Sequence, residues 1–129
     1  MNKEEYRTII DVYFRAFGTG NFTNVGFSPS VEFLSPLSGT TIKGREAVTK
    51  FIHNVTTRVA KVAVVSITVD PPTASGVWQM ETSKGRLYTL HNFFRLDDQG
   101  IVYIWPMFDP KAVMEDPKGL IQWLTGEGY

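Results

Sequence analysis

The order of helical and strand-like segments constrains this fold most, because helical patterns come first and strand patterns follow. Apolar residues recur every three or four positions from Tyr6 to Phe17, as in a helix with one face in the core. A second pattern of this kind covers 45–59, after Gly44. Three or four long strand patterns then fill 60–108, separated by short turns. Helices gathered before an antiparallel sheet predict an α+β domain with the helices on one face.

Glycine and proline set the expected limits of the shorter elements. The stretch 21–30 is polar, and Gly26 and Pro29 limit any helix there to one or two turns. A short strand over 31–34 ends at a turn around Pro36. The other expected elements are strands over 60–70, 77–81, 86–96 and 101–108, with Pro71-Pro72 and Gly76 as breakers, and a terminal helix over 117–124. A strongly curved sheet covered in this way encloses a cone whose mouth suits a small apolar molecule.

Length and composition exclude several classes of function. The 129 residues suffice for one compact domain, which we expect to span 1–129. Thirteen Lys and Arg balance thirteen Asp and Glu, so no net charge attracts nucleic acid or an anionic membrane. No cysteine is present, and the two histidines lack metal-ligand spacing, so we expect neither a metal nor another cofactor. Without a signal-peptide pattern or a long apolar run, the expected compartment is the cytoplasm.

Two parts of the chain resemble the nuclear transport factor 2-like superfamily. VEFLSPLSG at 31–39 and GREAV at 44–48 resemble its strand, proline turn and helix start. FFRLDDQGIV at 93–102, followed by Trp105 and the Phe-Asp pair at 108–109, looks like the final hairpin of its SnoaL-like members. Those members include polyketide cyclases and are similar to ketosteroid isomerases. The resemblance implies a cystatin-like α+β fold, a cone-shaped, strongly curved antiparallel sheet with N-terminal helices on its concave face.

The resemblance also assigns site residues one by one. Tyr13 matches the oxyanion-hole tyrosine of ketosteroid isomerases, and Asn92 stands where they carry a protonated aspartate. Ser35 stands where they carry the general-base aspartate, and a serine hydroxyl cannot remove an α-proton without its own base. SnoaL-like cyclases use an acid late in the final hairpin, and Asp109 lies there. The implied catalytic set is Asp109 as the acid–base group, with Tyr13 and Asn92 donating hydrogen bonds to an oxyanion.

Strand periodicity extends this set to a lining. Because alternate residues of a strand share a face, an inward Asn92 brings its alternate neighbours inside. The same alternation puts every second residue up to Asp109 on one face of the last strand. The expected substrate-binding residues are Ser35, Tyr88, Leu90, Phe94, Tyr103, Trp105 and Met107. An apolar lining with a few polar tips suits a small ligand and raises the pKa of an enclosed carboxyl group.

Each proposed catalytic residue also has a structural interpretation. Tyr13 lies on the core stripe of its helix, Asn92 can pair with backbone or water, and Asp109 precedes a proline where a strand ends. Glu81 is a reserve acid, because it and Trp78 project to opposite faces and the sequence does not decide which points inward.

Three functions remain open at this point. The first is a cofactor-independent isomerase, cyclase or dehydratase that acts on a small apolar carbonyl compound. The second is a non-catalytic module that binds an apolar ligand or a peptide, which Ser35 favours. The third is an epoxide hydrolase-like activation of water, for which no Asp-Arg-Asp arrangement is evident. The substitution Asp109→Asn distinguishes the first two functions. An enzyme would lose turnover and keep its ligand affinity, whereas a binding module would have no turnover to lose.

The outer face of the sheet predicts a partner. His91, Phe93 and Arg95 alternate with the inward residues, and we expect Val62, Val64 and Ile67 on a paired strand to share their face. Such a face is too apolar to remain against water. In this superfamily a second copy commonly covers it, so we expect a homodimer through the convex sheet face.

Overall fold

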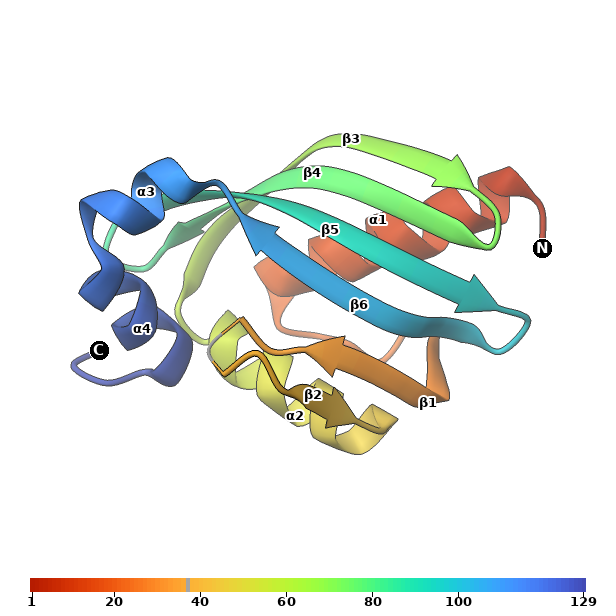
Figure 1. The fold of residues 1–129 in the computed structure, drawn as a ribbon, viewed down its shortest axis with the longest axis horizontal. Coiled ribbons are helices and arrows are strands. Elements are labelled where there is room, and N and C mark those ends of the chain that lie inside the picture. The colour runs from red at the N-terminus through yellow and green to blue at the C-terminus, as the bar shows by residue number, and fades with distance from the viewer. Residues whose placement is uncertain (37) are drawn as a thin grey trace.

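Figure 1 shows the fold in a computed structural model that describes residues 1–36 and 38–129. The strands are β1 (Phe27–Leu34), β2 (Thr41–Lys43), β3 (Val59–Asp70), β4 (Thr73–Thr82), β5 (Leu87–Asp97) and β6 (Gly100–Phe108). The helices are α1 (Lys3–Thr19), α2 (Arg45–Thr56), α3 (Pro110–Glu115) and α4 (Pro117–Thr125). All six strands join one sheet in the order β2-β1-β6-β5-β4-β3. The predicted α+β class is confirmed.

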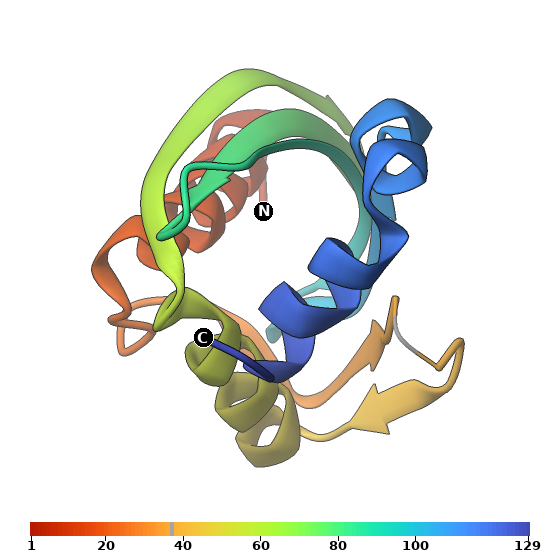
Figure 2. The same cartoon turned by 90° about the vertical axis from the view of Figure 1, so that its left-hand side faces the viewer.

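Local signals fix both ends of α1. Asn2 Oδ1 accepts a hydrogen bond from the Glu5 backbone N–H at 2.8 Å, and Glu5 Oε1 accepts one from the Asn2 backbone N–H at 3.2 Å. This capping box supplies two acceptors at the start of the helix. Gly20 ends α1 with a φ of 75°, which a residue without Cβ adopts at little cost. The predicted apolar stripe is buried against the sheet, which curves around α1 (Figure 2).

The sheet is mixed, whereas the sequence predicted an antiparallel one. β1 runs parallel to β6, with Phe33 opposite Ile104. A parallel pair needs a long crossover, and everything from β2 to β5 lies between these two strands. β1 also begins at Phe27, and 21–26 contains no helix. Pro29 is tolerated because it lies where the pairing of β1 with β6 is interrupted and no ladder N–H is required.

Gly76 was expected to break a strand, but it lies inside β4 and is buried. A Cβ at this position would approach Phe14 Cε2 to 2.6 Å and Cζ to 2.7 Å. The missing side chain therefore lets the Phe14 ring of α1 lie directly on the sheet. Gly76 is a site of close helix–sheet packing rather than an interruption.

We expect Gly76→Ala to lower the free energy of unfolding by about 1–3 kcal/mol, because the added methyl overpacks the helix–sheet contact. Urea denaturation followed by circular dichroism measures this change. Ser75→Ala, the neighbouring position on the outer face, is the control and shifts stability by less than about 0.5 kcal/mol. Equal stabilities of the two variants would contradict the proposed packing role.

The C-terminal region completes the cone at one end. The predicted terminal helix is confirmed as α4, whereas α3 was missed, and its six residues bury no side chain. Figure 2 looks into this end, where α2 and α4 lie along the near rim of the curved sheet. Among the described residues, no helix combines the length and apolar character needed to cross a membrane.

Candidate ligand site in the cone interior

Aromatic side chains fill most of the cone. Phe14 stacks on Trp78 with ring centroids 4.5 Å apart, and Phe17 meets the same indole edge-on at 4.9 Å. The remaining cavity has a volume of about 30 Å³. This space accommodates about one water molecule. Its lining includes Tyr13, Phe17, Trp78, Leu90, Asn92 and Trp123.

Asn92 is the polar side chain at the centre of this lining. It is 1% exposed, and its Oδ1 accepts a hydrogen bond from Trp78 Nε1 at 2.9 Å. Its Nδ2 is buried without a hydrogen-bond partner among the described residues. A buried donor without an acceptor is unfavourable by about 1–3 kcal/mol, so evolution rarely leaves one without a reason. The interior therefore presents an N–H donor that fits an acceptor atom brought by a ligand.

Tyr13 and Asn92, which the sequence placed in one site, both line the cavity. Tyr13 is 1% exposed, and its ring packs edge-on against Phe94 at 5.3 Å. Burial raises the pKa of the Tyr13 hydroxyl far above its usual value of 10.0, because the phenolate loses its hydration. Tyr13 is thus a neutral phenol at any physiological pH.

This raised pKa makes a stability prediction. The unfolded chain ionises Tyr13 near pH 10, whereas the native chain keeps it protonated, so stability is lost as pH rises above 10. Between pH 10 and 12 we expect the wild type to lose about 1.4 kcal/mol per pH unit more than Tyr13→Phe. Urea denaturation at successive pH values measures both slopes. Equal slopes of stability against pH for the wild type and Tyr13→Phe would show that Tyr13 has the same pKa in the native and unfolded states.

A second aromatic cluster lies at the mouth of the cone. The indole of Trp123, from α4, stacks on Tyr88 at 4.9 Å with an interplanar angle of 14°, and Phe108 meets it edge-on at 6.2 Å. Trp123 is 0% exposed and Tyr88 1% exposed. Trp123 Nε1 and the Tyr88 hydroxyl are buried and without partners among the described residues, like Asn92 Nδ2.

Arg58, between α2 and β3, fastens α4 to this mouth. Its Nε donates to the Trp123 carbonyl at 2.6 Å, and its Nη2 donates to the Leu124 carbonyl at 3.2 Å. Nη1 donates to Asn54 Oδ1 at 2.9 Å. Arg58 is 8% exposed, and its guanidinium lies at the negative end of the α4 dipole, which compensates its charge. Burial lowers the pKa of Arg58 from its usual value, because the charged guanidinium loses hydration.

Asp109 lies apart from Tyr13 and Asn92. It is exposed, it does not line the cavity, and its Oδ1 accepts from the Lys111 backbone N–H at 3.1 Å as the N-cap of α3. Ser35 is buried in the turn after β1, where its backbone N–H donates to the Thr40 carbonyl at 2.8 Å. The structure therefore brings two of the three predicted catalytic residues together.

The predicted inner face of β5 is confirmed, and that of β6 is wrong. Four alternate β5 residues are buried as expected: Tyr88, Leu90, Asn92 and Phe94. On β6 the residues opposite them are Ile104, Pro106 and Phe108. Tyr103, Trp105 and Met107 face outward instead, with Trp105 43% exposed.

A register shift explains the error on β6. Leu96 pairs with Ile101, but Arg95 pairs with Tyr103, so Val102 is an extra residue in the hairpin. A regular hairpin would have placed Tyr103 opposite Phe94 on the inner face. One inserted residue moves every later side chain of the strand to the other face.

Among the described residues, no carboxylate is buried in the interior. Across residues 1–36 and 38–129, every Asp and Glu side chain is exposed or only partly buried. Trp78 points inward and Glu81 outward, which removes the reserve acid from the cavity. Both histidines are exposed, and the described residues hold no group of three or more potential metal ligands. The interior therefore offers aromatic surface and hydrogen-bond donors, with no carboxylate or imidazole base.

Sequence reasoning missed Trp123 and Arg58. The expected terminal helix contained Trp123, but eight residues of pattern did not show which face met the sheet. Arg58 lay near the end of an expected helix, where an arginine is usually solvated. The available signal for Trp123 was its position as a large aromatic residue in a short C-terminal helix that begins at Pro117.

Comparisons with solved structures confirm the fold. A de novo designed protein with a curved β-sheet superposes with a TM-score of 0.78 at 24% identity, covering 98% of each chain. An NTF2-like protein of unknown function from Mesorhizobium loti gives 0.72 at 16% identity, over 83% of this chain and 93% of that one. A steroid delta-isomerase from Pseudomonas aeruginosa gives 0.68 at 17%, over 92% and 93%. The predicted nuclear transport factor 2-like fold is thus confirmed.

Sequence comparison places the chain in a family. No curated protein matches it significantly. The model of a family described as a domain of unknown function (DUF4904) matches residues 1–129. The chain therefore belongs to this DUF4904 family, within the NTF2-like fold.

Proposed function

We propose that this protein binds a small, largely apolar molecule with a carbonyl oxygen inside its cone, without acid–base catalysis. The observation that carries this proposal is the Asn92 Nδ2 donor, which is buried in an aromatic lining and lacks a partner among the described residues. A ligand oxygen would complete its hydrogen bonding and fix the ligand's orientation. Trp78 holds the Asn92 carboxamide by its other end, at 2.9 Å, so the donor is preoriented.

Binding without turnover is favoured over acid–base catalysis by the chemistry of the lining. An isomerase, cyclase or dehydratase needs a group that accepts a proton within hydrogen-bond reach of the substrate. Tyr13 keeps its proton because burial raises its pKa, and Asn92 does not ionise. Asp109 would have to leave its capping position at the start of α3 to reach the interior.

Matched ligands test the binding proposal. The probes are 1-tetralone, a bicyclic aryl ketone, and tetralin, the same skeleton without the oxygen. Calorimetry should show the ketone binding about tenfold more tightly, the value of one net hydrogen bond. Asn92→Leu should abolish this preference, whereas Gln79→Leu, which removes a carboxamide bonded to Thr89 on the outer face, should retain it. Equal affinities for the two probes in the wild type would refute the proposal.

Deuterium exchange tests the catalytic alternative. An acid–base enzyme of this kind would exchange the α-protons of bound 1-tetralone with D₂O faster than buffer does. Proton NMR measures this exchange as the loss of the α-proton signal of the ketone. We expect no acceleration by the wild type. Acceleration that disappears in Asp109→Asn would establish catalysis instead.

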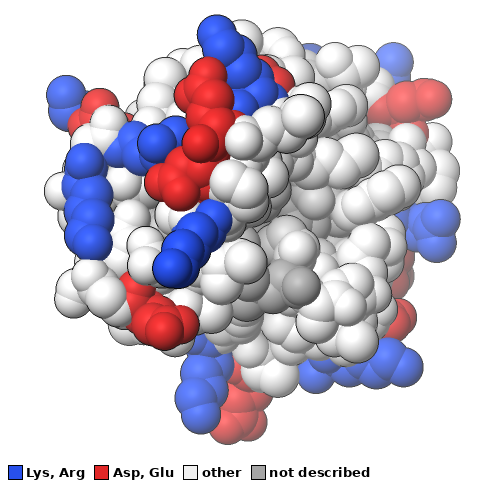
Figure 3. All heavy atoms as spheres, turned by 60° about the vertical axis from the view of Figure 1, so that its left-hand side comes forward, with Lys and Arg blue, Asp and Glu red and all other residues white. Residues whose placement is uncertain are grey.

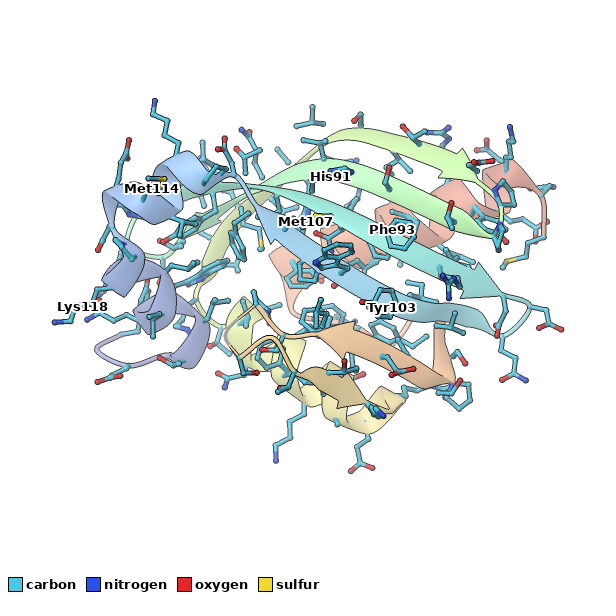
Figure 4. The ribbon with its side chains drawn as sticks, viewed as in Figure 1. His91, Phe93, Tyr103, Met107, Met114 and Lys118 are labelled. Atoms are coloured by element: carbon cyan, nitrogen blue, oxygen red, sulfur yellow. The ribbon has the colours of Figure 1, made fainter. Side chains whose placement is uncertain are left out.

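For the convex sheet face we propose a second copy of the chain as the partner. In Figure 4, Phe93, Tyr103, Met107 and His91 lie on the same broad face of β5 and β6. Trp105, on that face of β6, is 43% exposed, and Figure 3 shows a broad area without charged side chains beside the C-terminal helices. The predicted contribution of Val62, Val64 and Ile67 to this face is wrong, because all three pair with inward residues of β4 and pack on the core.

Sedimentation velocity tests this dimer. A stable interface requires about 800 Å² from each copy, so a charge at its centre should disrupt it. Trp105→Glu should be monomeric at concentrations where the wild type is a dimer. Val65→Glu, at a 60% exposed position on the edge strand β3, should remain a dimer. A monomeric wild type at high concentration would exclude the proposed partner.

A further inference from the structure

α4 closes the cavity with one large side chain. Trp123 and Leu124 of α4 line the cavity together with Asn92 and Leu90 from β5. The remaining volume of about 30 Å³ is too small for a bicyclic molecule. Any ligand larger than a few atoms therefore requires Trp123 to move.

The Trp123 indole packs well in its slot between Tyr88 and Phe108, but the polar groups there lack hydrogen-bond partners among the described residues. Its stacking on Tyr88 and edge contact with Phe108 are favourable aromatic geometries. Yet a buried tryptophan N–H normally finds a partner, and Trp123 Nε1 has none in the described structure. The stacked Tyr88 hydroxyl is likewise unpartnered. The slot therefore suits a flat bicyclic ring that carries polar atoms different from those of indole.

Few buried side chains attach the segment that carries Trp123 to the core. α3 buries no side chain, and α4 buries only Trp123 and Leu124. Its buried polar attachment is the pair of Arg58 hydrogen bonds to the Trp123 and Leu124 carbonyls, and Arg86 adds partly exposed ion pairs to Glu115 and Asp116 at 4.0 and 3.6 Å. Beyond α4, Lys84 Nζ donates to the Gly128 carbonyl at 2.8 Å at an exposed position. Segments with so few buried contacts open at lower free energy than the core.

We propose that α4 is a displaceable plug, and that the Trp123 indole holds the place of a flat, bicyclic aromatic ligand. This inference rests on the proposed binding function and adds the ligand class and the motion that admits it. On binding, the two Arg58 hydrogen bonds to α4 break and Trp123 leaves the mouth. The ligand ring then stacks on Tyr88, and its oxygen pairs with Asn92 Nδ2. The Tyr88 hydroxyl can bond a second polar atom of the ligand.

Hydrogen exchange on the wild-type protein tests the plug without any variant. Saturation with 1-tetralone should accelerate amide exchange in 120–124 by about tenfold or more, because the ligand selects the open state. The saturated, puckered analogue 1-decalone should bind at least about tenfold more weakly, since it cannot stack on Tyr88. Equal affinity for both ketones would overturn the aromatic ligand class.

Arg58→Met supplies an independent test, because it keeps an unbranched side chain and removes the donors. Removing the Arg58 hydrogen bonds to α4 raises the fraction of open protein, so 1-tetralone affinity should rise about tenfold or more. Arg15→Met, which removes an exposed ion pair with Asp11 on α1, should leave affinity unchanged. If the ketone binds but leaves amide exchange in α4 unchanged, and Arg58→Met has the same ketone affinity as the wild type, the plug is refuted. The proposed interior binding site would still stand. No binding by the wild type or by Arg58→Met would overturn the proposed function itself.

Discussion

Trp123→Ala is expected to lower the free energy of unfolding by about 3–5 kcal/mol, the largest effect of any substitution considered for this protein. The indole is fully buried between Tyr88 and Phe108, and its removal leaves a cavity at the mouth that its aromatic walls cannot fill. Urea denaturation monitored by circular dichroism measures the loss.

The matched control lies on the same helix. Ile121 is 51% exposed, so Ile121→Ala should change stability by no more than about 0.5 kcal/mol. A small effect at Trp123 as well would mean that α4 contributes little to the native core. That result would contradict the packing on which the closed mouth depends.

The second large effect is expected at Arg58. Arg58→Met should lower the free energy of unfolding by about 2–4 kcal/mol, because charge-assisted hydrogen bonds are lost and two buried carbonyls at the end of α4 lose their donors. Amide exchange should show which region is affected. The loss of protection should be greatest in 117–125.

Arg7→Met is the control for this substitution. Arg7 makes a single bond to the Ile67 carbonyl at 2.7 Å from an exposed position on α1, so its replacement should change stability by less than about 1 kcal/mol. An Arg58→Met variant as stable as Arg7→Met would show that the helix end is satisfied by water. The Arg58 hydrogen bonds would then contribute nothing to holding α4 in place.

The sequence predicted the interior where regular periodicity holds and failed where it is interrupted. On β5 the period of two placed Tyr88 and Asn92 correctly on the inner face, because no irregularity lies within that stretch. On β6 the same reasoning reversed the faces, since the extra residue Val102 shifts the register with Arg95. Nothing about the residue type of Val102 marks a bulge.

The closure of the cone could not be predicted for a different reason. The limits of α4 were readable from Asp116 and Pro117, but its docking depends on contacts with residues far away in the chain. Arg58 lies 65 residues before Trp123, whose carbonyl it binds. Local patterns report which residues form a helix, and they do not report where that helix packs.

The fold alone does not select a reaction. The steroid delta-isomerase from Pseudomonas aeruginosa shares this fold at 17% identity, yet here Ser35 and Asn92 stand where the resemblance implied aspartates. An NTF2-like cone can act as an acid–base site only when a proton-accepting group, such as a carboxylate or an imidazole, reaches its interior. In the described part of this chain, Asn92 supplies donors in that place.

The proposed function requires the Asn92 carboxamide to donate a hydrogen bond from Nδ2 to a ligand oxygen inside the cone. The most direct measurement is the ¹⁵N–¹H NMR spectrum of the Asn92 side-chain amide while the wild-type protein is titrated first with 1-tetralone and then with tetralin. We expect a saturable downfield shift of one Nδ2 proton with the ketone only. A spectrum in which the Asn92 amide responds to neither probe, or equally to both, would contradict it.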